Sequence, residues 1–420
     1  MSSLDRTRPF GRLLTAMVTP FTVAGELDLE AAQQLARYLV DTQHNDGLVI
    51  NGTTGEAPTT SDGEKAELVA AVVDAVGDRA SVLAGVGTFD TVHSVLLAEQ
   101  AAKAGADGLL VVTPYYSRPP QAGILQHFRV VADASALPVV VYDIPARTGI
   151  QLQTETMIQL AKHEQIVAVK DARGDLPAAA RVLAETDLAY YAGDDAMVLP
   201  LLAVGGTGVV GTSTHFSGAV TKELLDAHQR GDAAEALRLY RQLLPIYTGI
   251  FRTQGVILVK AGLAMQGRSA GPVRLPMVEA TEHERIVGVK DAKGDLVSSS
   301  KVIAETDLAY YAGDDAITLP LLSVGAVGVV GTSTHFAGRD TSAMIEAFER
   351  GELAAALELH RRLLPIYTGI FRTQGVILVK AGLALQGRPV GPVRMPMVEA
   401  TEHELSHLRQ DLADAGLLQP

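Results

Sequence analysis

The sequence contains no cysteine, which excludes disulfide bonds, thiolate nucleophiles and cysteine-ligated metal sites. It also lacks a net positive charge: the formal net charge is −13 and the pI is about 5.3, which argues against binding to nucleic acid or to an anionic membrane surface. The N-terminus has no apolar segment of the signal-peptide type. The longest apolar stretch, residues 196–211, is broken by Pro200 and falls short of a membrane span. We therefore expect a soluble, cytoplasmic protein.

A long internal repeat is the most informative feature that is present. Residues 166–284 recur as residues 286–404, in register and without a gap, and 33 of the 119 paired positions differ. This period is far longer than that of solenoids or propellers, so it indicates duplication of part of a domain. The second copy ends with a segment that the first copy lacks, in which Leu405, Leu408 and Leu412 share one face of a predicted helix.

Short apolar runs alternate with helical periodicity along the first half of the chain. Because these runs are almost continuously apolar, they predict parallel strands that are buried on both faces. Eight such βα units predict a (β/α)8 TIM barrel. A doubly wound open sheet is the alternative, but the first strand is not followed by a glycine-rich turn. The predicted strands begin near residue 13 and residue 47 and then cover residues 81–86, 108–113, 138–142, 167–170, 189–191 and 208–211.

The predicted domains are a barrel at 1–220, a C-terminal helical region at 221–283, and a second copy of strands six to eight with its helical region at 284–420. We expect the first copy to close the barrel, although a longer excursion to the second would cost only about 2 kcal/mol more in loop closure. The surplus copy would expose roughly 1,000 Å² of apolar surface, or about 25 kcal/mol. We therefore expect it to be buried, for instance against its counterpart in another chain, or else to stay unfolded.

Lys170, in the apolar strand VAVKD, is the strongest candidate for catalysis, and it recurs as Lys290. Catalytic groups of a barrel lie at the C-terminal ends of its strands. Burial lowers the pKa of a lysine from about 10.4 toward neutrality. The resulting neutral amine can form a Schiff base with a ketone. The alternative is a structural lysine that pairs with Asp171 or reaches the rim.

Other strand ends carry hydroxyl, phenol and guanidinium groups. The GTTGE loop at residues 52–56 offers backbone N–H groups and hydroxyls to a carboxylate, or it is an ordinary turn. Tyr115 and Tyr116 follow strand four, where they could equally serve in packing at the rim. Arg147 follows strand five, a position that suits bidentate binding of a carboxylate, although a plain surface charge is the alternative.

Three further patterns are weaker. Residues 206–211 match GxGxxG, but the match overlaps a strand instead of opening a helix, which argues against a dinucleotide site. Asp194 and Asp195 favour a helix cap over a metal site. His215 and His335 lie in the turn after strand eight of each copy, where we expect a structural role.

Taken together, the motifs GTTGE, VTPYYSRP, YDIPARTG and VKDARGD resemble the dihydrodipicolinate synthase family of the pyruvate-dependent class I aldolase superfamily. The resemblance covers residues 12 to about 283, and the second copy matches the same C-terminal half again. It implies a lyase of lysine and diaminopimelate synthesis that condenses pyruvate with L-aspartate 4-semialdehyde to 4-hydroxy-tetrahydrodipicolinate. It further implies no metal or organic cofactor and a homo-oligomer, usually a homotetramer.

Position by position, the resemblance implies that Lys170 forms the imine with pyruvate, with Lys290 as its duplicate. A proton relay is implied for Tyr142, Thr54 and Tyr116, the last reaching into the site of a neighbouring subunit.

Substrate binding is implied at four positions. Thr53 and Thr54 would hold the carboxylate of pyruvate, Arg147 would hold that of the semialdehyde, and Val210 would line the site through its backbone carbonyl.

Two alternatives to this function stay open. One is another aldolase of the superfamily with a different aldehyde acceptor, although the paired threonines and the RTG motif favour the synthase. The other is a catalytically inactive scaffold or assembly protein whose barrel the duplication has spoiled. Asp62 and Lys65 also stand where lysine-inhibited relatives carry histidines, which predicts weak or absent inhibition by lysine.

Overall fold

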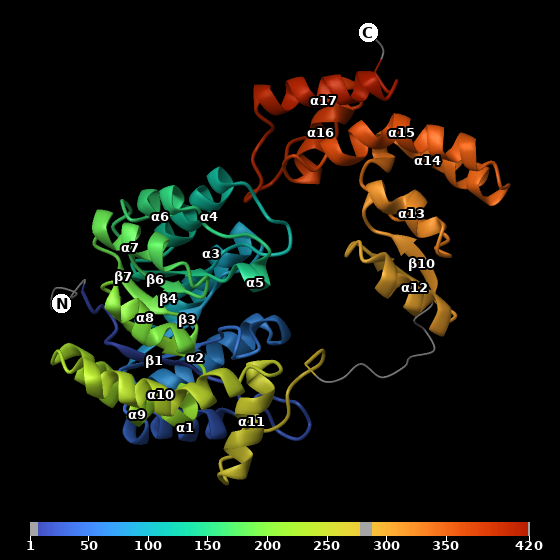
Figure 1. The fold of residues 1–420 in the computed structure, drawn as a ribbon. Helices are drawn as coiled ribbons and strands as arrows, with labels where there is room; N and C mark the ends of the chain where they lie inside the picture. The colour runs from blue at the N-terminus through green and yellow to red at the C-terminus, as the bar shows by residue number, and fades with distance from the viewer. Residues whose placement is uncertain (1–6, 278–287, 419–420) are drawn as a thin grey trace. The chain divides into compact units, whose positions relative to one another are not determined.

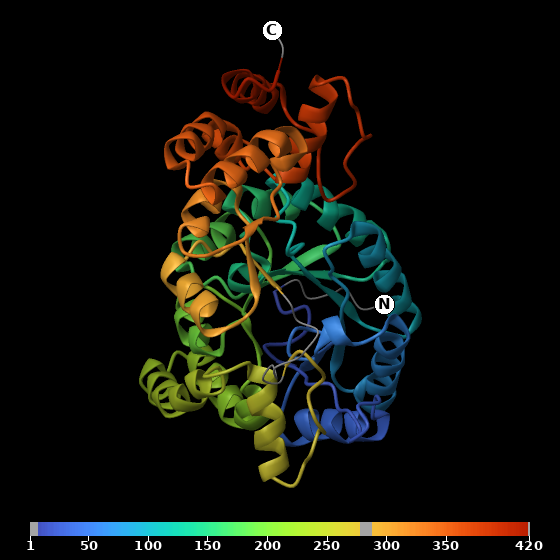
Figure 2. The same ribbon diagram turned by 90° about the vertical axis from the view of Figure 1, so that its right-hand side faces the viewer.

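The computed structural model describes residues 7–277 and 288–418, and the chain divides into two units. Unit 1 is Met1–Glu279 and unit 2 is Ala280–Pro420. In Figures 1 and 2 unit 1 runs from blue to yellow and unit 2 from orange to red. Each unit is described separately below.

Unit 1 contains a closed barrel of eight parallel strands in sequence order, with its helices on the outside (Figures 1 and 2). The strands are buried along their lengths because one face packs against the helices and the other fills the barrel interior. This confirms the predicted (β/α)8 architecture. The strands are β1 (Leu13–Ala16), β2 (Gly47–Ile50), β3 (Ser81–Gly85), β4 (Gly108–Val112), β5 (Val139–Asp143), β6 (Ile166–Asp171), β7 (Ala189–Ala192) and β8 (Gly208–Gly211).

The helices of unit 1 begin at polar capping residues that the sequence supplies repeatedly. Asp28, Asp90, Asp175 and Asp232 each accept a backbone N–H of the first turn, and Ser61 forms a capping box with Glu64. The helices are α1 (Leu29–Arg37), η1 (Tyr38–Thr42), η2 (Ala57–Thr59), α2 (Asp62–Val76), α3 (Thr91–Lys103), α4 (Gln121–Asp133), α5 (Pro145–Thr148), α6 (Thr154–Leu160), α7 (Leu176–Glu185), η3 (Asp195–Met197), α8 (Val198–Ala203), α9 (Thr214–Gln229), α10 (Ala233–Gly249) and α11 (Gly255–Met265).

The first copy of the repeat closes the barrel, as expected. Strand β6 pairs with β5, which places Lys170 opposite Tyr142, and β8 pairs with β1, which places Val210 opposite Leu14. Both partner strands lie outside the duplicated segment, so the second copy is left without them.

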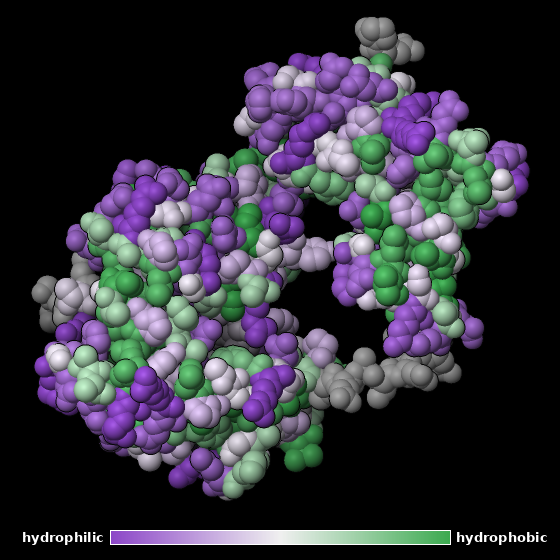
Figure 3. All heavy atoms as spheres, in the orientation of Figure 1, coloured by the Kyte–Doolittle hydropathy of each residue, from purple (hydrophilic) through white to green (hydrophobic). Residues whose placement is uncertain are grey.

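The second copy folds into a three-stranded parallel sheet of its own, in the order β11-β10-β9, so the expectation that it could stay unfolded was wrong. One face is covered by α12 and α13, where Tyr310 and Ala312 are buried. The other face corresponds to the barrel interior and is open: Val330 is 48% exposed, against 2% for Val210. Figure 3 shows hydrophobic side chains at the surface of unit 2. Its elements are β9 (Gly288–Asp291), α12 (Leu296–Glu305), β10 (Ala309–Ala312), η4 (Asp315–Ile317), α13 (Thr318–Leu322), β11 (Gly328–Val329), α14 (Thr334–Glu349), α15 (Leu353–Gly369), α16 (Gly375–Leu385) and α17 (Glu402–Asp414).

The terminal segment forms the helix α17, as its leucine spacing predicts. Thr401 and Glu404 form a capping box at its start, and Leu408 and Leu412 are buried in the cluster formed by the helices of unit 2. Among the residues that the structure describes, no helix is long and apolar enough to cross a membrane.

Candidate active site

The centre of the site is formed by two neighbouring strands at their C-terminal ends. Lys170 on β6 lies opposite Tyr142 on β5, and its Nζ is 4.4 Å from the centre of the tyrosine ring. The two side chains are 5% and 4% exposed. A lysine and a phenol, both largely removed from water, therefore face each other inside the mouth of the barrel.

Burial lowers the pKa of Lys170 to about 8, and the positive charge of Arg147 acts in the same direction against the opposing effect of Asp195. At pH 7 about a tenth of such an amine is neutral, roughly 200 times the fraction for an ordinary lysine of pKa near 10.4. The site thus holds an amine that can act as a nucleophile near neutral pH.

Burial raises the pKa of Tyr142 to about 12, although its hydrogen bond with the side chain of Thr53 opposes this rise. The phenol therefore keeps its proton at neutral pH. Because it contacts both Lys170 and the GTTGE loop, Tyr142 can pass a proton between the amine and a ligand bound on that loop.

A chain of hydrogen bonds, which the sequence did not reveal, leads from this loop to a buried carboxylate. Thr54 Oγ1 lies 3.1 Å from Thr212 Oγ1. The backbone N–H of Thr212 donates to Asp195 Oδ2 at 3.1 Å, and Ser213 Oγ donates to Asp195 Oδ1 at 2.8 Å. Asp194 caps η3, as expected for one aspartate of the pair, whereas Asp195 lies beneath the site. The sequence feature that could have indicated this chain of hydrogen bonds is the unchanged recurrence of GDDA and GTSTHF in both copies.

The GTTGE loop is fixed from below by a second arrangement that the sequence did not reveal. Its last residue, Glu56, is fully buried, and its Oε1 lies 2.7 Å from Nζ of Lys260 on α11. Its Oε2 accepts the backbone N–H of Arg274 at 2.8 Å, and the carbonyl of Gly55 accepts Thr19 Oγ1 at 2.6 Å. The helical region therefore holds the loop that carries Thr53 and Thr54.

A cavity of about 530 Å³ opens beside these groups, and Thr53, Tyr115, Tyr142 and Arg147 are among the residues that line it. The Arg147 side chain is exposed, and its Nη1 donates to Gln254 Oε1 at 3.0 Å. A guanidinium at the entrance can bind an anionic ligand without the cost of burying an unpaired charge. Val210 lies deeper, where its side chain is buried in the barrel interior.

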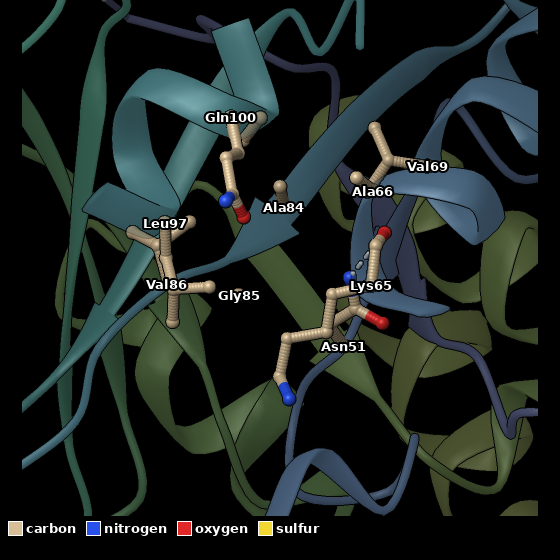
Figure 4. A pocket seen from close by; sticks show the side chains of 10 residues that line it. Asn51, Lys65, Ala66, Val69, Ala84, Gly85, Val86, Leu97 and Gln100 are labelled. Atoms are coloured by element: carbon tan, nitrogen blue, oxygen red, sulfur yellow. Dashed lines mark hydrogen bonds between the residues drawn. The ribbon is translucent and has the colours of Figure 1, made fainter. Parts of the chain in front are cut away.

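Part of the wall of this cavity is formed by α2 and α3. Oδ2 of Asp62 lies 2.9 Å from Nε2 of His93. Nζ of Lys65 donates to the carbonyl of Thr60. Behind Lys65 lies a small cavity of about 10 Å³, where Asn51 donates its side-chain amide to the Lys65 carbonyl at 3.1 Å (Figure 4). That volume holds about one water molecule, so it is no ligand site.

Two sequence candidates, Tyr116 and Lys290, lie away from this centre, and so does His335, for which the sequence predicts a structural role. Tyr116 has a φ of 65° and is 92% exposed, so it does not reach the site of its own barrel. Lys290 is exposed on the open sheet of unit 2. His335 is also exposed, whereas its counterpart His215 is buried, accepts the backbone N–H of Val18, and has its pKa lowered to about 4 by burial.

Comparison with known proteins agrees with this geometry. The family model of the dihydrodipicolinate synthetase family matches residues 9–286 and, a second time, residues 281–415. The chain belongs to the dihydrodipicolinate synthetase family. The double match places both copies of the repeat in that family.

Individual family members match about two thirds of this chain. The 4-hydroxy-tetrahydrodipicolinate synthase of Acidothermus cellulolyticus is 63% identical over 284 residues, which are 68% of this chain and 92% of the relative. 4-Hydroxy-tetrahydrodipicolinate synthase 2 of Streptomyces coelicolor is 58% identical over 66% of this chain and 92% of its own length. The crystal structure of a dihydrodipicolinate synthase from Bacillus anthracis superposes with a TM-score of 0.63 at 38% identity, covering 66% of this chain and 96% of that chain.

Proposed function

We propose that the chain is a 4-hydroxy-tetrahydrodipicolinate synthase, a lyase that condenses pyruvate with L-aspartate 4-semialdehyde in lysine and diaminopimelate synthesis. The names of its relatives support this reaction. The observation in the structure that carries it is the buried Lys170, whose pKa is lowered to about 8 beside Tyr142. The proposed setting is the cytoplasm.

The neutral amine of Lys170 attacks the keto carbon of pyruvate and gives a carbinolamine. Loss of water, which needs one proton delivered to the leaving hydroxyl, then yields the imine. Tyr142 is the proposed carrier of this proton because its phenol stays protonated and contacts the lysine. General acid–base help of this kind contributes about 10² to 10⁴ in rate. Thr54, which is joined to Thr212, extends the relay away from the lysine.

The substrate carboxylates are assigned by the positive and hydrogen-bonding groups of the cavity. Thr53 and Thr54 offer hydroxyl and backbone donors to the carboxylate of pyruvate. Arg147 at the entrance is the proposed partner of the semialdehyde carboxylate. Val210 is proposed to contribute its backbone carbonyl to the wall of the site.

Tyr116 is assigned to the site of a neighbouring chain. Its left-handed backbone and its 92% exposed side chain place the phenol outside its own barrel. The proposal therefore includes a homo-oligomer in which Tyr116 of one copy completes the proton relay of another. Tyr116→Phe is expected to lower kcat while leaving imine formation on Lys170 intact.

The test is a coupled assay with pyruvate and L-aspartate 4-semialdehyde on the wild type, Lys170→Ala, Lys290→Ala and the double variant. The wild type and Lys290→Ala are expected to turn over equally, whereas Lys170→Ala loses at least about 10³-fold in kcat. Loss of activity in Lys290→Ala would contradict the assignment. A wild type without turnover would support the inactive scaffold, and turnover only with another aldehyde would support the related aldolase.

A further inference from the structure

The duplication has left the chain with two nearly identical surfaces for one terminal helix. Helices α11 and α16 differ in sequence at a single position, Met265 against Leu385. Only α16 is followed by α17, because the first copy continues into unit 2 at the equivalent point. The surface of unit 1 that corresponds to the α17-binding surface of unit 2 is here called the α11 face; it consists of Ile246, Leu258, Ala261, Gly262 and Met265.

In unit 2, α17 lies along α15 and α16 (Figure 1). Leu408 and Leu412 are 0% exposed. Arg372 donates to both carboxylate oxygens of Asp411, one of these bonds being 3.0 Å long, and Gln386 Nε2 donates to the carbonyl of Leu417 at 2.9 Å. The contacts of α17 therefore include two buried leucines, one ion pair and a hydrogen bond to the backbone just after its C-terminal end.

The α11 face presents the same stripe in a more exposed state. Leu258, Ala261, Gly262 and Met265 recur at i, i+3, i+4 and i+7 on one side of the helix. Met265 is 89% exposed. Leu258 is partly exposed, whereas its counterpart in unit 2 is 1% exposed, and the same contrast holds for Ile246.

The ion-pair position on the α11 face is also open. Arg252 is the counterpart of Arg372, and its guanidinium is exposed and bonds to none of the residues that the structure describes. A Cβ built on Gly369 would clash with the carboxylate of Asp411, whereas a Cβ on Gly249 would meet nothing within 4 Å. The two surfaces therefore match in residues and differ in whether a helix occupies them.

We propose that the α11 face binds α17 of a second copy of this chain. The contacts available there repeat those of unit 2, with Leu408 and Leu412 on the apolar stripe and Asp411 on Arg252. The α11 face is also the better supported of the two surfaces. Val256 on the far side of α11 is 4% exposed against the barrel, whereas the corresponding Val376 of α16 is 44% exposed. A preorganised surface loses less freedom when it binds.

The direct test measures binding of a fluorescent peptide of residues 400–418 to the full-length chain. The fluorescence anisotropy of the peptide is recorded as the concentration of the chain is raised. We expect one saturable site with a dissociation constant of about 1–100 µM, since a short helix must also be ordered on binding. Gly249→Leu, at a position with open space around it, is expected to weaken binding at least tenfold while unit 1 stays folded and active. Absence of saturable binding, or binding unaffected by Gly249→Leu, would overturn the proposal.

Charge reversal tests the orientation of the bound helix. Arg252→Glu is expected to weaken the peptide at least tenfold, and a peptide with Asp411→Arg is expected to restore most of the affinity. Rescue cannot arise from non-specific apolar contact. If both peptides bind Arg252→Glu equally poorly or equally well, the assigned register is wrong.

Cross-linking distinguishes a second copy from the chain's own helix, because the sequence contains no other cysteine. Gln266→Cys, the counterpart of Gln386, and Leu417→Cys are placed in separate chains, which are mixed and treated with a short bismaleimide. A product at twice the 44.3 kDa chain mass is expected, and Gly369→Leu, which expels α17 from its own site, should increase its yield. A double variant with both cysteines in one chain is treated in parallel, and cross-links that form only within its single chains, with none between the mixed chains, would overturn the assignment to a second copy.

Discussion

The buried ion pair between Lys260 and Glu56 allows a prediction about stability. The second copy of the repeat supplies the control, because it contains the same lysine as Lys380. The two side chains are 4% and 0% exposed. Burial lowers the pKa of Lys260 more than Glu56 raises it, so the loss of hydration outweighs the attraction. The intact pair therefore adds little stability, and the large cost arises when one charge stays behind alone.

Lys260→Ala leaves the Glu56 carboxylate buried with the backbone N–H of Arg274 as its remaining described donor. Breaking a buried pair in this way costs about 3–5 kcal/mol. For a unit of this size, 1 kcal/mol corresponds to about 2–4 °C in Tm, so the barrel transition should fall by roughly 6–20 °C. The KM for pyruvate should rise as well, because Glu56 holds the loop that carries Thr53 and Thr54.

The matched control is Lys380→Ala in the second copy. Lys380 donates to the Pro392 carbonyl, but Glu56 lies outside the duplicated segment, so unit 2 has no equivalent carboxylate. We expect a change within about 0.5 kcal/mol. Scanning calorimetry of both variants measures the difference. Equal shifts in Lys260→Ala and Lys380→Ala, or a shift below about 2 °C in Lys260→Ala, would refute the reasoning.

Three further predictions concern the site. Because the reactive form of Lys170 is the neutral amine, kcat/KM for pyruvate should rise with pH and level off above about 8; a midpoint above pH 9.5 would contradict the lowered pKa. Asp195 raises the pKa of Lys170, so Asp195→Asn should move this midpoint down by about one unit, whereas Asp315→Asn should leave it unchanged. Lysine at about 1 mM should reduce activity by less than half, since Asp62 is paired with His93; inhibition by half or more would show a working feedback site.

The barrel and the position of Lys170 could be predicted because they depend on local patterns. Continuous apolar strands between helical segments predict eight parallel strands, and a lysine at the end of such a strand must lie at the mouth. The first copy also follows strand five directly in the sequence, so its closing of the barrel could be predicted from neighbouring segments.

The supporting residues could not be predicted because they depend on closure of the barrel. Lys260 and Glu56 are far apart in the chain and meet only when α11 packs beneath the GTTGE loop. Asp194 and Asp195 are equally suited to cap a helix, and only the pairing of β7 with β8 places Asp195 under Thr212.

The expectation that the second copy could stay unfolded is wrong because it treats all of its apolar surface as exposed. In the structure its three strands keep one face covered by α12 and α13, so Tyr310 and Ala312 remain buried. The open face is therefore only part of the apolar surface, and the three strands fold together with the helices that cover the other face.

The most direct test of the central claim is chemical trapping of the imine. The chain is incubated with pyruvate, reduced with borohydride and digested, and the modified peptide is identified by mass. We predict an added mass of about 72 Da, that of a reduced pyruvyl imine, on the peptide that contains Lys170. An unaltered mass, or an adduct confined to Lys290, would contradict the account.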